Sequence, residues 1–247
     1  MERRMADYDP LENWTGELRR IMTVDVQGRR GRHYYCLVRA WGAEASSRLL
    51  HWQVCWSIEE VRELQKTWKV DSGNVAIDSG AYTSEIYQNV VDSGYKWKPM
   101  KGEDKEYFLL RGMRRLYNTT TADPAIGTQR EGRVRMLRLY LYAKYGCLDR
   151  MTNLMHGVFG NWRLPKKLDG LDDYLHQVCA YDRREESIAR REHETKLVWY
   201  RRSKEDHLAS CEIMQVAAAS ASGMLNVPGH TPVPLPGEQT EELPLDG

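Results

Sequence analysis

Two aspartates stand in β-rich segments of the sequence, where a charged side chain needs a partner. Asp25 interrupts the apolar, β-branched run IMTVDVQ (residues 21–27), and Asp78 lies in the short apolar run NVAIDSG (residues 74–80). An isolated buried carboxylate is costly because it loses its hydration. Carboxylate oxygens are ligands that Mg²⁺ and Mn²⁺ favour. If the two strands are neighbours, the pair predicts a divalent-metal site; the alternative is that Asp78 is only a turn or cap residue.

The start of a predicted helix over residues 206–222 offers a second group of metal-ligating side chains. The stretch EDHLASCE contains Glu205, Asp206, His207 and Glu212. Asp206 also fits an N-cap, where an aspartate accepts from the first backbone N–H groups of a helix, and His207 also fits a surface histidine. Both interpretations stay open beside a role in a metal site.

Three β-rich runs, followed by alternating helical and strand segments, predict an α/β fold. The glycine-containing turn GRRGR (residues 28–32) indicates a hairpin, and Ser57 with Glu60 three positions later matches a capping box. We expect three antiparallel strands, a helix, a strand, a helix and a strand around a mixed central sheet. The strands are predicted at residues 21–27, 33–42, 48–56, 74–80, 97–102 and 196–202, and the helices at residues 57–68, 83–94 and 206–222.

Composition bounds the class of protein. The 247 residues include 36 Lys and Arg against 35 acids, so net charge alone does not indicate a nucleic-acid binder. The segment from Val227 onward has four acids and no Lys or Arg, which leaves about +5 on residues 1–226. The sequence has five scattered cysteines without CxxC spacing, no apolar N-terminal core and no run of about 18 apolar residues. These features predict a soluble cytoplasmic protein with no membrane partner.

One folded domain between two polar ends is expected. Residues 1–19 are polar and peripheral in this prediction, and residues 20–222 carry the α/β pattern, although residues 103–135 are charged and turn-rich without a clear period. Residues 223–247 contain five of the nine prolines and few large apolar side chains. Because such a segment cannot offset its ordering entropy by burial, we expect a disordered C-terminal tail.

Four stretches of the sequence carry a family resemblance: IMTVDVQGRRGRHYYCLVRAWG, NVAIDSGAYTSEIYQNV, KWKPMKG and HLASCEIMQVAAA. Together they resemble the nuclease domain of terminase large subunits of tailed bacteriophages, particularly the lambda type, over about residues 12–222. That family has an RNase H-like fold in which acids on the first strand, a later strand and the final helix bind two divalent ions. The resemblance implies a Mg²⁺- or Mn²⁺-dependent DNA endonuclease, with Asp25 and Asp78 as the first two metal ligands.

The last predicted helix departs from the family pattern. Related sequences commonly carry a leucine, one residue, an aspartate and a cysteine there, whereas HLASC places Ser210 at the expected aspartate. Asp206 and His207 lie about one helical turn upstream and can reach the same ion. RNase H-like resolvases sometimes use a histidine at this place. Asp206, His207 and, in reserve, Glu212 therefore remain as candidates for the third ligand.

The resemblance also implies partners and a mechanism. The chain has no GxxxxGK[ST] phosphate-binding loop, although full terminase large subunits carry an ATPase with that motif, so the resemblance implies the nuclease domain alone. Its substrate would be concatemeric double-stranded phage DNA, cut during genome packaging in the host-cell cytoplasm. The terminase ATPase domain, the small terminase subunit and the portal are the implied partners. The implied mechanism is in-line attack by a metal-activated water.

Basic clusters flank the predicted site elements. A nuclease that cuts many sequences binds DNA mainly through phosphates, and each cluster is either a DNA contact or a solvated charged face. The candidate DNA contacts are Arg29, Arg30 and Arg32 in the first turn, Lys96, Lys98 and Lys101 after the Asp78 segment, and Arg201, Arg202 and Lys204 beside the last helix.

Two other functions also fit the sequence. One is another RNase H-like nuclease, such as a resolvase, which would prefer branched over linear duplex. The other is a weakened or non-catalytic packaging module, in which Ser210 marks lost activity and the acidic tail docks on a partner.

Overall fold

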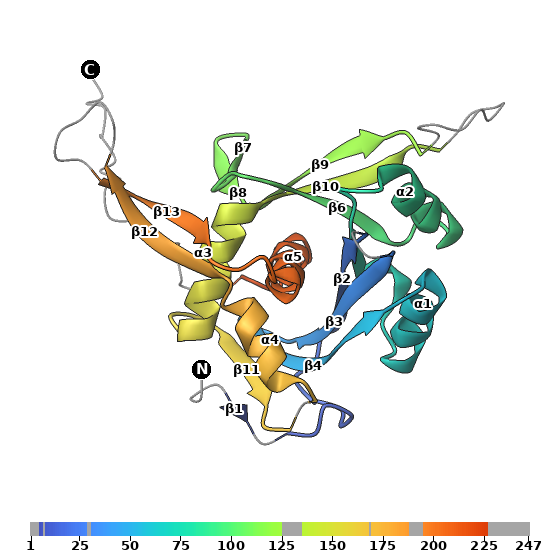
Figure 1. Ribbon diagram of the computed structural model, residues 1–247, viewed down its shortest axis with the longest axis horizontal. Helices are drawn as coiled ribbons and strands as arrows, with labels where there is room; N and C mark the ends of the chain where they lie inside the picture. Colours follow the sequence, from blue (N-terminus) through green and yellow to red (C-terminus); the bar gives the residue numbers. More distant parts are fainter. Residues whose placement is uncertain are drawn as a thin grey trace, which may run out of the picture.

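The chain folds around one large mixed β-sheet (Figure 1). The computed structural model describes residues 5–6, 8–28, 31–124, 135–167, 169–187 and 195–226. The strands of the sheet, in chain order, are β1 (Met5–Ala6), β2 (Arg19–Gln27), β3 (His33–Trp41), β4 (Ser46–Cys55), β5 (Val75–Asp78), β6 (Lys98–Glu103), β9 (Tyr117–Ala122), β10 (Leu137–Ala143) and β11 (Asn161–Pro165).

Helices and two small antiparallel sheets of two strands each complete the described part of the chain. No helix there is long and apolar enough to cross a membrane. The helices are α1 (Ile58–Thr67), α2 (Thr83–Asp92), α3 (Lys144–His156), α4 (Leu171–Val178), α5 (His207–Ala221) and the 3-10 helix η2 (Ser72–Asn74). The small sheets are β7 (Phe108–Leu110) with β8 (Met113–Arg115), and β12 (Tyr181–Ser187) with β13 (Thr195–Arg201).

The strand order of the sheet is β1-β11-β4-β3-β2-β5-β6-β10-β9. Strands β2, β3 and β4 form antiparallel pairs, whereas β5 pairs in parallel with β2, β6 with β5 and β10 with β6. The expected α/β fold, with three antiparallel strands followed by parallel ones in a mixed sheet, is therefore confirmed. Because β2 and β5 are parallel neighbours, their carboxyl ends meet at one edge of the sheet.

Local signals explain two of the elements around this edge. Gly31, in the turn between β2 and β3, has a φ of 94°, which is accessible to glycine at little cost. At the start of α1 the Ser57 hydroxyl accepts from the backbone N–H of Glu60 at 3.1 Å, so the predicted N-cap is confirmed.

Helices cover both faces of the sheet. In Figure 1, α5 lies against β2 and β3 with α3 and α4 beside it, whereas α1 and α2 lie on the opposite face. The alternation along β2 matches these two layers, because Ile21 belongs to the core on the α5 face and Met22 and Val24 belong to the core on the α1 and α2 face. Asp25 is thus on the face that α5 covers.

Two regions differ from the sequence-based expectation. The unassigned segment 103–135 contributes β7, β8 and the sheet strand β9, while residues 125–134 lie outside the described residues. Met224 and Leu225 fall in the predicted tail, yet both pack against the core, and the backbone N–H of Ala45 donates to the Met224 carbonyl at 3.1 Å. Packing therefore continues past the expected boundary at residue 223, and the remainder of the tail, residues 227–247, also lies outside the described residues.

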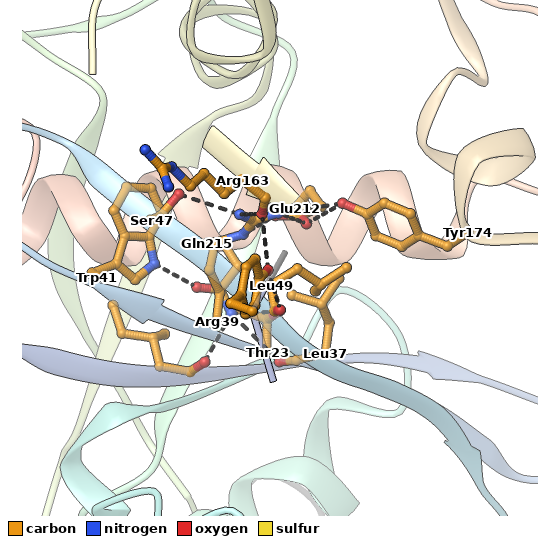
Figure 2. Close-up of polar contacts among 12 residues, drawn as sticks. Thr23, Leu37, Arg39, Trp41, Ser47, Leu49, Arg163, Tyr174, Glu212 and Gln215 are labelled. Atoms are coloured by element: carbon orange, nitrogen blue, oxygen red, sulfur yellow. Dashed lines mark hydrogen bonds and ion pairs between the residues drawn. The ribbon is translucent and has the colours of Figure 1, made fainter. Parts of the chain in front are cut away.

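A buried ion pair joins α5 to β3 (Figure 2). Arg39 and Glu212 are both 0% exposed; Arg39 Nη2 donates to Glu212 Oε1 at 2.6 Å and Arg39 Nε donates to Glu212 Oε2 at 3.2 Å. The hydroxyl of Tyr174 on α4 donates to the same carboxylate at 2.6 Å, and the Arg39 guanidinium lies 3.5 Å from the Trp162 ring centroid. The pair is therefore fully enclosed and bidentate, as a buried charge requires.

Gln215 fixes the same helix against two strands. Its amide Nε2 donates to the Ile21 carbonyl at 3.0 Å and to the Leu37 carbonyl at 3.4 Å, and its Oε1 accepts from Trp41 Nε1 at 2.9 Å (Figure 2). Since a buried amide without partners is costly, these bonds favour one register of α5 over β2 and β3.

We expect Glu212→Ala to lower the free energy of unfolding by about 3–5 kcal/mol, because it leaves the buried Arg39 without its counter-charge. Urea denaturation followed by circular dichroism measures the change. The double variant Arg39→Met with Glu212→Leu removes both charges and fills the space, so it should recover most of the loss. Equal losses in the single and double variants would contradict this role.

Candidate active site

Asp25 and Asp78 meet at the carboxyl edge of the two central strands. Strands β2 and β5 are paired up to Val24 and Ile77, and each aspartate is the next residue of its strand. Asp25 is only 6% exposed and belongs to the face of the sheet that α5 covers. The two strands are neighbours, which is the condition under which the two aspartates could share an ion, and the two carboxylates lie at a poorly hydrated edge.

The electrostatics of Asp78 reflect this proximity. Burial, followed by the negative charge of Asp25, raises the pKa of Asp78 from 3.8 to about 6. The backbone N–H groups of Gly80 and Ser79 and the charge of Lys101 act in the opposite direction. The Gly80 N–H donates to Asp78 Oδ1 at 3.1 Å. The pair therefore favours binding a proton or another cation.

His207, the first residue of α5, contacts Asp25. Its Nδ1 lies 3.0 Å from Asp25 Oδ2, which also accepts from Gln27 Nε2 at 2.8 Å. The imidazole stacks on the ring of Tyr35 with centroids 4.3 Å apart and an interplanar angle of 22°. Tyr35 is paired with Asp25 across β2 and β3. His207 is thus held on two sides, and it is a contact of the site rather than a free surface histidine.

Two tyrosines border the carboxylates and were not expected from the sequence. A signal for Tyr35 was present in the sequence: counting outward from the GRRGR turn sets position 25 opposite position 35. Tyr142 on β10 lies beside Gly102 of β6. A Cβ added to Gly102 would be only 2.9 Å from the Tyr142 phenol oxygen. Burial, with the charges of Asp78 and Asp25, raises the pKa of Tyr142. No local pattern indicates this second contact, because it depends on the pairing of β6 with β10.

Asp206 occupies the N-cap position of α5 but does not cap the helix with its side chain. It is 6% exposed, accepts from the Tyr181 hydroxyl at 2.6 Å, and its Oδ2 lies 3.5 Å from Arg201 Nε. The capping interpretation is wrong for this side chain, because β12 and β13 supply its partners instead of the helix N–H groups.

Glu212 is the clear correction among the candidate metal ligands. Its carboxylate is enclosed with Arg39 and Tyr174, and among the described residues these are its ion-pair and hydrogen-bond partners in place of Asp25 and Asp78. A helix acid whose charge is matched by an arginine has no need of an ion. Within the described ranges, no group of three or more His, Cys, Asp or Glu side chains has the arrangement of a metal site.

The predicted DNA contacts have different surroundings. Arg29 and Arg30 lie outside the described residues. Arg32 forms an ion pair with Glu85 and lies 3.6 Å from the Tyr82 ring centroid, and Arg201 is turned toward Asp206. Lys96, Lys101, Arg202 and Lys204 are exposed, and Lys98 is half-buried.

Comparisons with known proteins identified no relative of this chain. No protein-family model, no curated protein and no solved structure matches the chain.

The raised pKa of Asp78 predicts a pH-dependent stability. Because the folded state binds this proton more tightly than the unfolded state, the stabilising contribution is complete below about pH 4 and is lost as the pH rises through about 6. In EDTA at pH 7.5, Asp78→Asn should therefore raise the free energy of unfolding by about 1–3 kcal/mol, and at pH 4 by little. Urea denaturation at the two pH values measures the difference.

The exposed Asp104 gives a matched control. Asp104→Asn should change the free energy of unfolding by less than about 0.5 kcal/mol at either pH. An effect of Asp78→Asn that is the same at both pH values would show that the ionised carboxylate is not destabilised.

Proposed function

We propose that the chain is a divalent-metal-dependent DNA endonuclease with an RNase H-like fold. The observation that carries the proposal is the meeting of Asp25 and Asp78 on adjacent central strands, with His207 of α5 against Asp25. Buried like charges at a sheet edge are characteristic of functional sites rather than of stabilising cores.

The topology supports the RNase H-like part of the proposal. The strand order β4-β3-β2-β5-β6 combines an antiparallel three-stranded meander with two further parallel strands. In chain order, the first strand of this unit (β2) and the fourth (β5) each carry an aspartate, and α5 covers β2. The family that the sequence resembles is expected to have acids on a first strand, a later strand and a final helix.

The residues at the edge fit a divalent cation. Asp25 and Asp78 are oxygen donors that share negative charge in a poorly hydrated place, and the raised pKa of Asp78 shows that a positive partner would be favoured. These two carboxylates would hold Mg²⁺ or Mn²⁺, with Asp206 or His207 as the third contact. When bound, such ions polarise a phosphoryl oxygen and acidify water.

The remaining residues of the site have positioning roles in this proposal. The Gln27 amide and His207 hold the Asp25 carboxylate in one orientation. Tyr35 limits the rotation of the His207 ring, which keeps its Nδ1 directed at Asp25. Asp206 is linked to the β12–β13 strand pair through Tyr181, so movement of these strands would shift the Asp206 carboxylate relative to the site.

A basic groove supports DNA as the substrate. Lys96, Lys98, Arg135 and Arg138 line a groove of about 610 Å³ together with three threonines, and no carboxylate is among its described lining residues. Lys98 lies two positions before Met100, the β6 residue paired with Asp78. Cations in a groove that begins on a strand of the site suit phosphate contacts. The substrate would be double-stranded phage DNA during genome packaging, with the partners that the sequence resemblance implies.

Two observations favour a second candidate function, a DNA-binding packaging module with weak or no cleavage. Ser210 stands where the resembling family has an acid, and the described residues contain no metal-site group of three or more His, Cys, Asp or Glu side chains. Two carboxylates alone hold a divalent ion weakly. Such a module would bind DNA without cutting it.

We expect the chain to nick and linearise supercoiled plasmid with Mg²⁺ or Mn²⁺ but not with EDTA. Asp25→Asn and Asp78→Asn should each abolish cleavage, because each removes a charged oxygen ligand. Agarose gel electrophoresis over a time course measures the result. The exposed-residue variant Asp104→Asn is the control and should cut like the wild type. Plasmid binding without cleavage in either metal would favour the second candidate function.

The role of His207 is tested separately. We expect His207→Ala to slow metal-dependent cleavage by about 10- to 100-fold, because residues that orient a metal ligand typically have effects of this size. Plasmid binding in EDTA, measured by gel shift, should stay within about twofold of wild type. A variant that cuts at the wild-type rate would remove His207 from the site.

A further inference from the structure

A row of aromatic rings leads away from the candidate site along the same edge of the sheet. It begins with His207 on Tyr35. Tyr35 meets His33 edge to face at a centroid distance of 5.7 Å, and His33 lies 5.3 Å from Trp56 at an interplanar angle of 39°. The row therefore connects the partner of Asp25 with the molecular surface.

The register of the strands explains why these rings align. Asp25 is paired with Tyr35, and Gln27 with His33, so both rings are on the α5 face of β3. Tyr34 is paired with Cys55, the last residue of β4, which sets the next residue, Trp56, opposite His33. Along this edge Asp78 thus lies on one side of Asp25, and the aromatic rings lie on the other.

Trp56 is unusual among the tryptophans of the chain. All eight lie in the described ranges, and only Trp56 is exposed, with 64% of its surface accessible. A tryptophan can remove 150–250 Å² of surface from water when it is buried, so an exposed one suggests a contact with another molecule. Trp56 ends the row of rings that starts at the candidate site. A molecule bound at that site is therefore the nearest candidate for the contact.

The backbone at Trp56 is held firmly while its side chain faces solvent. Its N–H donates to Glu60 Oε2 at 2.8 Å, and the next residue, Ser57, caps α1. A hydrophobic residue before an N-cap often packs on the residue four positions beyond the cap. Here that residue, Val61, is buried in the core, whereas the indole lies beside His33.

We infer that Trp56, His33 and Tyr35 form a stacking platform for unpaired nucleobases of the substrate strand next to the candidate site. This inference rests on the proposed function and narrows its substrate class. Base faces stack on aromatic side chains with little dependence on sequence. A continuous duplex hides its base faces, so the platform favours a single strand, an overhang or a fork over uninterrupted duplex.

A basic groove on the same sheet favours nucleic acid over a protein partner. The groove with Lys96, Lys98, Arg135 and Arg138 supplies phosphate contacts, and it begins on β6, two strands from β2. The platform is on β3 and β4, on the other side of β2. The groove lies toward the amino ends of β6 and β10, whereas the platform lies at the carboxyl end of β2, on the same edge as the aspartates.

The test is binding of a 2-aminopurine-labelled single-stranded oligonucleotide, and of a blunt-ended duplex of the same sequence, in EDTA. We expect the wild type to bind the single strand several-fold more tightly than the duplex and to quench the 2-aminopurine fluorescence. Trp56→Ala should weaken single-strand binding by about 5- to 100-fold and relieve the quenching. Trp56→Phe keeps a ring and should stay within about threefold of wild type.

Val158→Ala is the matched control, since Val158 is an exposed apolar residue at 59% accessibility outside the row. It should leave both affinities unchanged. If the wild type binds the duplex well and Trp56→Ala alters neither affinity nor quenching, the stacking inference fails while the proposed function stands. If the wild type binds neither oligonucleotide, the inference and the proposed function fail together.

Discussion

The docking of α5 on β2 and β3 is the constraint on which the candidate site depends. Arg39 and Glu212 neutralise each other in the core, and the Gln215 amide bonds to backbone carbonyls of both strands. Neither interaction contributes much net stability relative to a well-packed apolar alternative, because desolvation offsets the attraction. What they supply is uniqueness: a shift of α5 by one residue would leave a buried charge and a buried amide without partners. The position of His207 over Tyr35 follows from that register.

Stability and chemistry act in opposite directions at two places along this helix, Glu212 within it and His207 at its start. Around Glu212 every charge has an opposite charge, whereas Asp25 and Asp78 face each other at the carboxyl edge of the strands and the pKa of Asp78 is raised. Repulsion of this kind is tolerated because the sheet and α5 are held by interactions elsewhere. The two acidic groups therefore serve different purposes, although Glu212 belongs to α5 and Asp25 contacts the same helix through His207.

Sequence patterns identified the strands and the helix that carry the site residues better than the contacts that those residues make. The strands with Asp25 and Asp78 and the helix with His207 have strong local signals, and their elements were predicted correctly. Glu212 was misinterpreted because spacing along a helix does not show that an arginine 173 residues away matches its charge. Arg39 itself follows a register shift between β3 and β4, which no local pattern indicates. The strands β7 and β8 were missed because they are short, and every residue of Met113–Arg115 is exposed, so no alternation exists to detect.

The sequence separation of these contacts has a consequence for the nascent chain. Asp25 and His207 are 182 residues apart, and the partners of Arg39 on α4 and α5 follow it by more than 130 residues. During translation the strands β2 to β6 emerge with both aspartates long before α5 is synthesised. Until then Arg39 has no counter-charge and the α5 face of the sheet is open to water. The candidate site is therefore among the last features to assemble, so a ribosome-bound fragment carries the acids without the arrangement that orients them.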